Sequence, residues 1–198
     1  MNIFTKKVFD KKAQKRKSPL LFQKGLSLIE ASMVLALSAI VVSGVMYYYQ
    51  AASDNNKTQS TVSEVMSIIS AVNGLYVGTS GYKGLNKDVI MNTSAIPENY
   101  KDSNKIIHPF GGEIEIGEAT GATKYFIILK DVPQGACVNL ASMNFGTSLA
   151  GAGVGAAAET AARRGTAAKG QLEDKALTPA DAAKLCKAAT NNIAFLLK

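Results

Sequence analysis

The first strong pattern along the chain is a long run of apolar residues near its N-terminal end. Residues 31–49 carry no charge and are rich in Val, Leu, Ile, Ala and Met. Glu30 is the only Asp, Glu, Lys or Arg between residues 26 and 53. About 20 apolar residues are enough for a helix to cross a bilayer. The pattern therefore predicts a transmembrane segment over residues 26–53.

An amphipathic pattern continues the same helix beyond the polar group 53–57. Apolar residues recur there at three- and four-residue spacing, which is typical of one buried helix face. They are Val62, Val65 or Met66, Ile69, Val72 and Tyr76. No proline interrupts residues 26–76, so nothing forces a break. We expect one helix of about 50 residues, roughly 75 Å long at 1.5 Å per residue, with one face of its second half to bury.

The C-terminal part reads as a mixture of short helices and strands. Residues 77–110 have the Gly, Asn and Ser content of a long connection with little regular structure, and a short helix is expected near residues 86–92. The alternation in 113–117 and the apolar run in 124–130 predict an antiparallel hairpin. The sequence thus predicts an α+β fold, in which a long N-terminal helix packs on an antiparallel β-sheet.

Two further helices and a last strand are expected near the C-terminus. One helix should follow Pro133 and carry Cys137. Another should begin at Thr178 as N-cap, with Pro at its first position, and carry Cys186. Residues 193–197 can supply the last strand.

A segment of small residues separates these helices. Residues 150–170 are Gly or Ala at 14 of 21 positions and contain no large apolar residue. Such a segment buries too little surface to offset its own ordering entropy. We interpret it as an exposed loop or a weakly held helix.

The positive charge lies almost entirely in the first 25 residues. They contain one acid, Asp10, and eight basic residues, so they account for the whole net charge of +7. The basic residues are Lys6, Lys7, Lys11, Lys12, Lys15, Arg16, Lys17 and Lys24. From Leu26 onward, 14 basic and 14 acidic side chains cancel. No basic helix face remains in the rest of the chain for binding nucleic acid. Because the basic residues lie on the N-terminal side of the apolar run, the positive-inside rule places the N-terminus in the cytoplasm.

The apolar run is favoured as a retained span over a cleaved secretory signal. A signal peptide has an apolar region of 7–15 residues followed by a cleavage site of small residues. This run is longer and ends in three tyrosines, Tyr47 to Tyr49, as expected for an aromatic belt at the outer interface. Cys137 and Cys186 then lie outside the cytoplasm, where an even cysteine count predicts one disulfide. Two buried free thiols are the alternative.

The sequence Lys24-Gly-Leu-Ser-Leu-Ile-Glu30 lies where the basic region meets the apolar run. It resembles the processing site of type IV prepilins, and the leader of 25 residues followed by Leu resembles the type IVb subclass. Motifs such as Asn-Thr-Ser-Ala-Ile-Pro and Pro-Phe-Gly-Gly-Glu are similar to those of the bundle-forming pilins of enteric bacteria. The resemblance implies the type IV pilin fold, cleavage between Gly25 and Leu26 by prepilin peptidase, and N-methylation of Leu26. It also implies a role for Glu30 in subunit assembly.

The resemblance also implies an organisation of the chain. Residues 1–25 would be the leader, 26–53 the transmembrane and assembly helix, and 54–198 the rest of that helix plus a globular head. Independently of the family, an acid within a membrane span is costly and normally has a partner. The helix dipole and a new amine at Leu26 could supply one for Glu30. An ordinary single-pass anchor with Glu30 reaching the interface is the alternative.

No pattern of catalytic or metal-binding residues stands out. His108 is the only histidine, and it suggests a surface or turn role rather than a metal ligand. Glu113 and Glu115 would share one strand face, which is more often solvated than catalytic. We expect no enzyme activity, cofactor or metal.

The functional prediction is a major structural subunit of a type IVb pilus that supports adhesion, bundling and autoaggregation. Its partners would be further copies of itself in a helical homopolymer, the prepilin peptidase and the assembly machinery. It would lie in the inner membrane with its head in the periplasm, and then in a surface pilus, with no nucleic acid involved. The alternative is a minor pilin or pseudopilin, a membrane-tethered accessory subunit.

Overall fold

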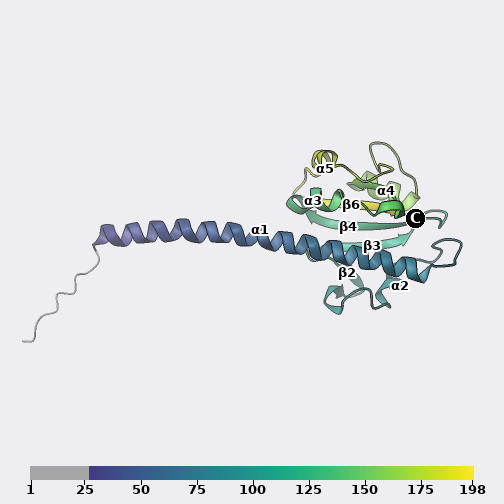
Figure 1. Ribbon diagram of the computed structural model, residues 1–198, viewed down its shortest axis with the longest axis horizontal. Coiled ribbons are helices and arrows are strands. Elements are labelled where there is room, and N and C mark those ends of the chain that lie inside the picture. Colours follow the sequence, from purple (N-terminus) through teal and green to yellow (C-terminus); the bar gives the residue numbers. More distant parts are fainter. Residues whose placement is uncertain (1–26) are drawn as a thin grey trace, which may run out of the picture. The chain divides into compact units, whose positions relative to one another are not determined.

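The computed structural model describes residues 27–198, and within them the chain combines helices with one antiparallel sheet (Figure 1). It divides into two units, residues 1–44 and 45–198, each considered by itself. The elements are α1 (Leu28–Leu75), α2 (Lys87–Met91), β1 (Lys101–Asp102), β2 (Lys105–Ile107), β3 (Glu113–Glu118), β4 (Tyr125–Pro133), α3 (Gln134–Ala141), β5 (Leu149–Val154), α4 (Ala156–Arg164), α5 (Pro179–Leu185) and β6 (Thr190–Leu197), with 3₁₀ turns η1 (Glu98–Tyr100) and η2 (Gly146–Ser148). The predicted α+β class is confirmed.

Helix α1 has 48 residues and confirms the single long helix. In the second unit its buried face consists of Thr61, Glu64, Val65, Ile68, Ile69 and Val72. Of the two alternatives in the predicted stripe, Val65 is buried and Met66 is 52% exposed. A helical turn of 3.6 residues places positions 61, 65, 68 and 72 on one face, and Met66 lies to the side of it.

The sheet of the second unit has the strand order β1-β2-β3-β4-β6-β5, and every neighbouring pair is antiparallel. The predicted hairpin is β3–β4, with Ile116 opposite Ile127. The last strand, β6, lies between β4 and β5 rather than at an edge. The connection 77–110 is more regular than expected, because it contains α2, β1 and β2.

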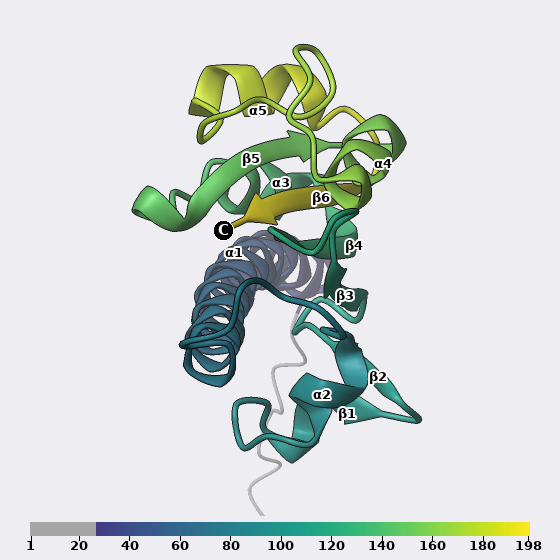
Figure 2. The ribbon, with the colours of Figure 1, turned by 90° about the vertical axis from the view of Figure 1, so that its right-hand side faces the viewer.

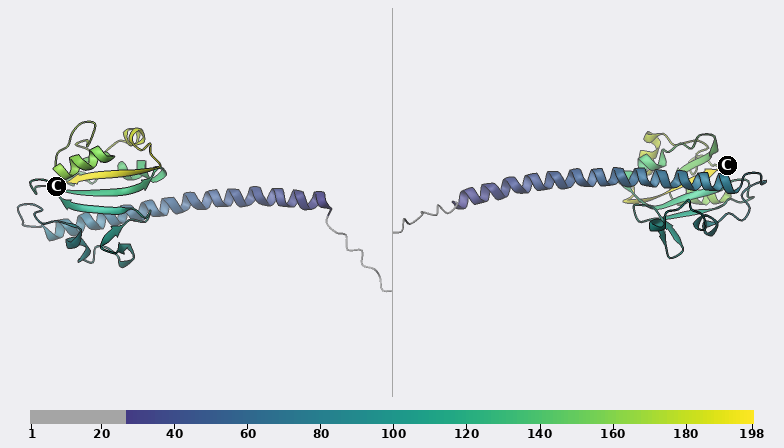
Figure 3. Two further views of the ribbon diagram at one scale, coloured as in Figure 1. Left: turned by 180° about the vertical axis from the view of Figure 1, so that it is seen from behind. Right: turned by 60° about the horizontal axis from the view of Figure 1, so that its bottom comes forward.

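Both faces of the central strands are buried. Tyr125, Ile127 and Leu129 of β4 join the same core as α1, whereas Phe126 and Ile128 join a second core on the other face. This alternation follows from the two-residue period of a strand. The sheet curves around the C-terminal half of α1, and α4 covers the opposite face (Figures 2 and 3).

The prediction for residues 150–170 was right in allowing a helix, α4, but wrong about its exposure, because much of this segment is packed against the sheet or forms strand β5. Ala158, Ala161 and Ala162 of α4 are buried on β4 and β6. Gly153 of β5 has no room for a side chain, because a Cβ there would meet the carbonyl of Gln171. Small residues thus allow a close approach of backbones, which a search for large apolar side chains does not detect.

The short predicted helices are present. Asn86 caps α2 through a 3.1 Å bond from the Val89 N–H, and Thr178 caps α5 with Pro179 at its start. Helix α3 carries Cys137 as expected. Cys186 lies directly after α5, as its C-cap residue.

Candidate functional site

Glu30 lies in the first turn of α1 and takes part in capping that helix. Its Oε2 accepts a hydrogen bond of 2.9 Å from the Ser27 N–H, and the Ser27 hydroxyl accepts one of 3.3 Å from the Ile29 N–H. These bonds occupy backbone donors that an α-helix leaves free at its start. The Ser-x-x-Glu spacing is that of a capping box, so Ser27 could have been found from the sequence.

The other predicted processing residues, Gly25 and Leu26, lie outside the described residues. Nothing in the structure therefore tests the cleavage site. The role of Glu30 in assembly likewise stays a prediction, because no second copy of the chain is present.

The first part of α1 exposes an apolar surface on all its sides. Its large apolar side chains from Leu28 to Tyr49 are between 58% and 88% exposed. The helix is long and apolar enough to span a membrane, judged by length and composition. Soluble monomers rarely expose apolar patches of more than a few hundred Å², so this surface requires either lipid or other protein around it.

Glu64 is a buried carboxylate on the packed face of α1. It is 4% exposed, and neither carboxylate oxygen has a hydrogen-bond partner among residues 27–198. Burial raises its pKa to about 8, because desolvation disfavours the charged form. Its spacing from Thr61 and Ile68 places it on the apolar stripe, and this could have been noticed from the sequence.

The disulfide predicted from the cysteine count is present between Cys137 and Cys186, with a Cα–Cα distance of 5.9 Å. Both residues are buried. The bond ties α3 to the end of α5 across a separation of 49 residues. Such a closure stabilises a fold by about 4 kcal/mol in the chain-entropy model.

Glu113 and Glu115 share one face of β3, as predicted, and they belong to an ion-pair network. Arg163 of α4 pairs with both oxygens of Glu115, with 2.8 Å between Nη2 and Oε2. Lys130 lies 2.9 Å from Glu115 and 3.8 Å from Glu113. The Arg163 guanidinium lowers the pKa of Glu115 to about 2. All these charges are matched, so the network fastens α4 to the sheet.

His108 has a turn role but is not at the surface, because it is 1% exposed. Its Nε2 lies 2.7 Å from the carbonyl oxygen of Lys130, and its Nδ1 accepts a 3.2 Å hydrogen bond from the Phe110 N–H. Burial lowers its pKa, so the ring stays neutral, with Nε2–H donating. His108 therefore clamps the β2–β3 turn onto β4. Among residues 27–198, no group of His, Cys, Asp and Glu side chains could hold a metal ion.

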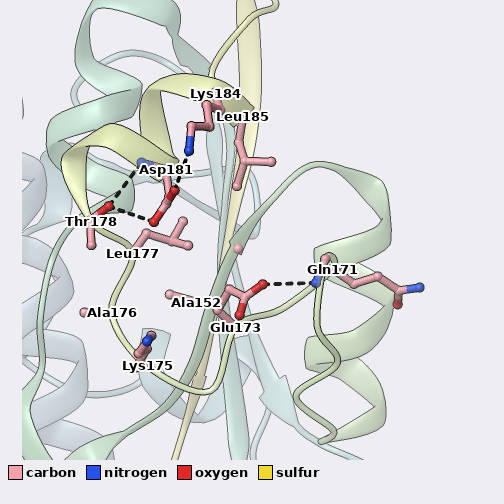
Figure 4. A pocket seen from close by; sticks show the side chains of 12 residues that line it. Ala152, Gln171, Glu173, Lys175, Ala176, Leu177, Thr178, Asp181, Lys184 and Leu185 are labelled. Atoms are coloured by element: carbon pink, nitrogen blue, oxygen red, sulfur yellow. Dashed lines mark hydrogen bonds and ion pairs between the residues drawn. The ribbon is translucent and has the colours of Figure 1, made fainter.

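A cavity of about 360 Å³ lies between β5 and α5 (Figure 4). Three of its four charged side chains, those of Glu173, Asp181 and Lys184, have local partners, whereas Lys175 has no hydrogen-bond or ion-pair partner among the described residues. Lys184 lies 3.0 Å from Asp181, which also accepts from the Thr178 hydroxyl at 2.8 Å. Glu173 accepts from the Gly170 N–H at 3.0 Å. These contacts cap a helix and a turn.

Comparison with known proteins identifies the family. The family model described as Bundlin matches residues 50–196. The chain belongs to the Bundlin family. This membership agrees with the predicted resemblance to type IV pilins of the bundle-forming kind.

Relatives of this Bundlin family member cover nearly the whole chain. Two proteins named "Major structural subunit of bundle-forming pilus", from Escherichia coli O111:H- and from Escherichia coli O127:H6 (strain E2348/69 / EPEC), are each 48% identical over 184 residues. Each match covers 89% of this chain and 95% of the relative. A solved structure, TcpA, a type IV pilin from Vibrio cholerae El Tor biotype, is 15% identical with a TM-score of 0.47. The match covers 71% of this chain and 98% of that structure's chain.

Proposed function

We propose that this chain is the major structural subunit of a type IVb, bundle-forming type of pilus. The observation that carries the proposal is the identity of 48% across 89% of the chain to relatives with that name. The exposed apolar surface of α1 supports it, because a polymer of stacked helices would cover that surface. The role is structural, with adhesion, bundling and autoaggregation as properties of the filament.

The subunit would reach the filament through a membrane stage. Residues 1–25 would act as a leader that prepilin peptidase removes between Gly25 and Leu26, followed by methylation of the Leu26 amine. Residues 26–53 would then hold the subunit in the inner membrane, with residues 54–198 in the periplasm. The charge distribution supports this order, because removal of residues 1–25 would remove seven net positive charges and leave a neutral chain.

Glu30 would align an incoming subunit with the growing filament. Its Oε2 already accepts from the Ser27 N–H, and this bond directs the carboxylate toward the start of the helix. The Oε1 atom would receive the Leu26 amine of a neighbouring subunit or of the same helix. A charge-assisted hydrogen bond of this kind in a water-poor helix core is strong enough to select one register.

Substitution of Glu30 tests the assembly role. In the native host, Glu30→Ala should leave processing intact and abolish or sharply reduce surface filaments, as measured by immunoblot of sheared and cell-bound fractions. Asp54→Ala is the matched control, because Asp54 is an exposed acid on the same helix beyond the apolar run. Normal filament yield from Glu30→Ala would refute the assembly role. In parallel, Gly25→Ala should leave the chain at precursor size.

A further inference from the structure

Leu185 is an exposed apolar side chain on a head whose other large apolar side chains are mostly covered. Among the exposed large apolar side chains of residues 27–198, only those of Val77 and Leu185 lie outside α1. Leu185 is the last residue of α5 and is 42% exposed. Ala182 and Cys186 beside it are buried. Helix α5 therefore packs through those residues and leaves Leu185 at the surface.

Two cavities adjoin Leu185. The first cavity is the one of about 360 Å³ between β5 and α5, and Figure 4 shows Leu185 on one side of it and Lys175 on the other. The second cavity has a volume of about 470 Å³, and its lining includes Asp131 of β4, Asn192 of β6 and Leu185 itself. All residues that line the two cavities belong to residues 45–198, so both lie within one unit. Because Leu185 lines both cavities, it separates them.

Each cavity contains charged side chains without a partner in their own subunit. In the first cavity this is Lys175, which is exposed and forms no ion pair among the described residues. In the second cavity the exposed Asp131 and Lys187 form none either. Only the backbone N–H of Asp131 is bonded, to the Asn192 Oδ1 at 3.0 Å. A free cation on one side of Leu185 and a free carboxylate on the other make this surface complementary to itself.

The surface around Leu185 lies on the side of the head that is remote from α1. Figures 1 and 2 both show the sheet between α5 and the part of α1 that belongs to the second unit. In the proposed filament, α1 is covered by helices of other subunits, so the opposite side of the head faces outward. The surface around Leu185 is then available to a subunit of a neighbouring filament.

We propose that this surface joins two filaments through a two-fold contact between copies of this chain. A two-fold axis at Leu185 places the two Leu185 side chains against each other and the first cavity of each copy opposite the second cavity of the other. Lys175 of each copy then faces Asp131 of the other, on both sides of a central apolar contact. Lys187 likewise faces the first cavity of the other copy, whose lining includes Glu173. The inference rests on the proposed function and assigns bundling to a defined surface.

Repetition along the filament makes this small contact effective. A single exposed ion pair contributes little to binding. A filament presents the same surface on every subunit, however, and simultaneous contacts between two filaments reinforce one another. Loss of one contact per subunit should therefore reduce bundling strongly. The filament itself, which α1 holds together in the proposed function, should stay intact.

Thiol cross-linking at Leu185 tests the two-fold contact. The full chain with Leu185→Cys is expressed in the native host, and its added thiol is the only free one, because the two native cysteines form the disulfide. Mild oxidation of sheared, bundled filaments should give disulfide-linked dimers. Val77→Cys, at the other exposed apolar position outside α1, is the matched control. It should give roughly tenfold fewer dimers, since a disulfide requires Cα atoms within about 7 Å.

Charge reversal tests the flanking ion pairs. Lys175→Glu and Asp131→Lys should each reduce the fraction of filaments that sediments as bundles roughly tenfold. The double variant should restore bundling, because each pair forms again with its signs exchanged. Lys83→Glu is the matched control, because Lys83 is an exposed lysine that lines neither cavity, and its bundling should equal that of the native chain.

The yield of sheared filaments separates this inference from the proposed function. Absence of filaments from the native chain would refute the proposed function. With native filament yields, equal dimer formation by Leu185→Cys and Val77→Cys overturns the two-fold contact. Single charge variants that bundle like the native chain, or a double variant that bundles no better than the single ones, overturn the pairing of Lys175 with Asp131. Loss of filaments in the charge variants would place this surface inside the polymer and would also overturn the inference.

Discussion

Replacement of Glu64 by Gln should stabilise the head at neutral pH. Glu64 is 4% exposed without a hydrogen-bond partner among the described residues, and burial raises its pKa from 4.5 to about 8. Folding at pH 7 therefore requires uptake of a proton that the unfolded chain lacks. Because the unfolded pKa is 4.5, protonation of Glu64 at pH 7 lowers the free energy of unfolding by roughly 3 kcal/mol. Gln has nearly the same shape and no charge to neutralise, so Glu64→Gln should recover most of that free energy.

The pH dependence gives the sign of the effect. Because the folded-state pKa of Glu64 is raised, its contribution to stability is fully present below the unfolded pKa of 4.5. That contribution is lost as the pH rises toward 8. From pH 5 to pH 7 the loss from Glu64 is about 2.5 kcal/mol. His108 acts in the opposite direction, because its lowered pKa makes stability fall as pH drops below about 6.5. Hence the difference between Glu64→Gln and the native chain isolates Glu64 at each pH.

The assay is chemical denaturation of both full-length chains in nonionic detergent between pH 5 and 8. Unfolding of the head is followed by tyrosine circular dichroism, since the chain has no tryptophan. The advantage of Glu64→Gln should grow steadily with pH. An advantage that is the same at pH 5 and pH 7, or a less stable Glu64→Gln at pH 7, would refute the reasoning.

Three further variants test the packing of the head. Arg163→Ala removes a bidentate ion pair with Glu115 and a cation–π contact with Phe126. Thermal unfolding should therefore show a free energy of unfolding lower by about 1 kcal/mol. An unchanged free energy of unfolding would mean that α4 is held by its alanines alone. The double change Cys137→Ser with Cys186→Ser should cost about 4 kcal/mol and increase protease sensitivity, and a stable, protease-resistant head would contradict this. Gly153→Ala should destabilise by roughly 1–3 kcal/mol, because its Cβ meets backbone. Gly135→Ala in helix α3 has open space around it and should be neutral or slightly stabilising.

The long helix and the main hairpin could be predicted because their patterns are local. A charge-free run and a repeating three- and four-residue spacing identify α1, and alternation identifies β3. The N-caps Asn86 and Thr178 mark helix starts for the same reason. The capping box formed by Ser27 and Glu30 is equally local, and its Ser-x-x-Glu spacing is visible in the sequence.

The order of strands and the packing of small residues could not be predicted in this way. Strand β5 is made mostly of Gly and Ala, and its place beside β6 depends on residues 39 to 48 positions later in the chain. The buried alanines of α4 gain their packing from Phe126 and Leu196, which no pattern within α4 reveals. The burial of His108 likewise depends on the Lys130 carbonyl, 22 residues away. These are tertiary contacts, and they become visible only in the folded chain.

Quantitative mass spectrometry of filaments sheared from the cell surface tests the central claim most directly. A major structural subunit should account for most of the filament protein, begin at a methylated Leu26, and contain the Cys137–Cys186 disulfide. A chain present only in trace amounts, or one that still carries residues 1–25, would contradict the account. In the first case the chain would be an accessory subunit, and in the second it would not have been processed for assembly.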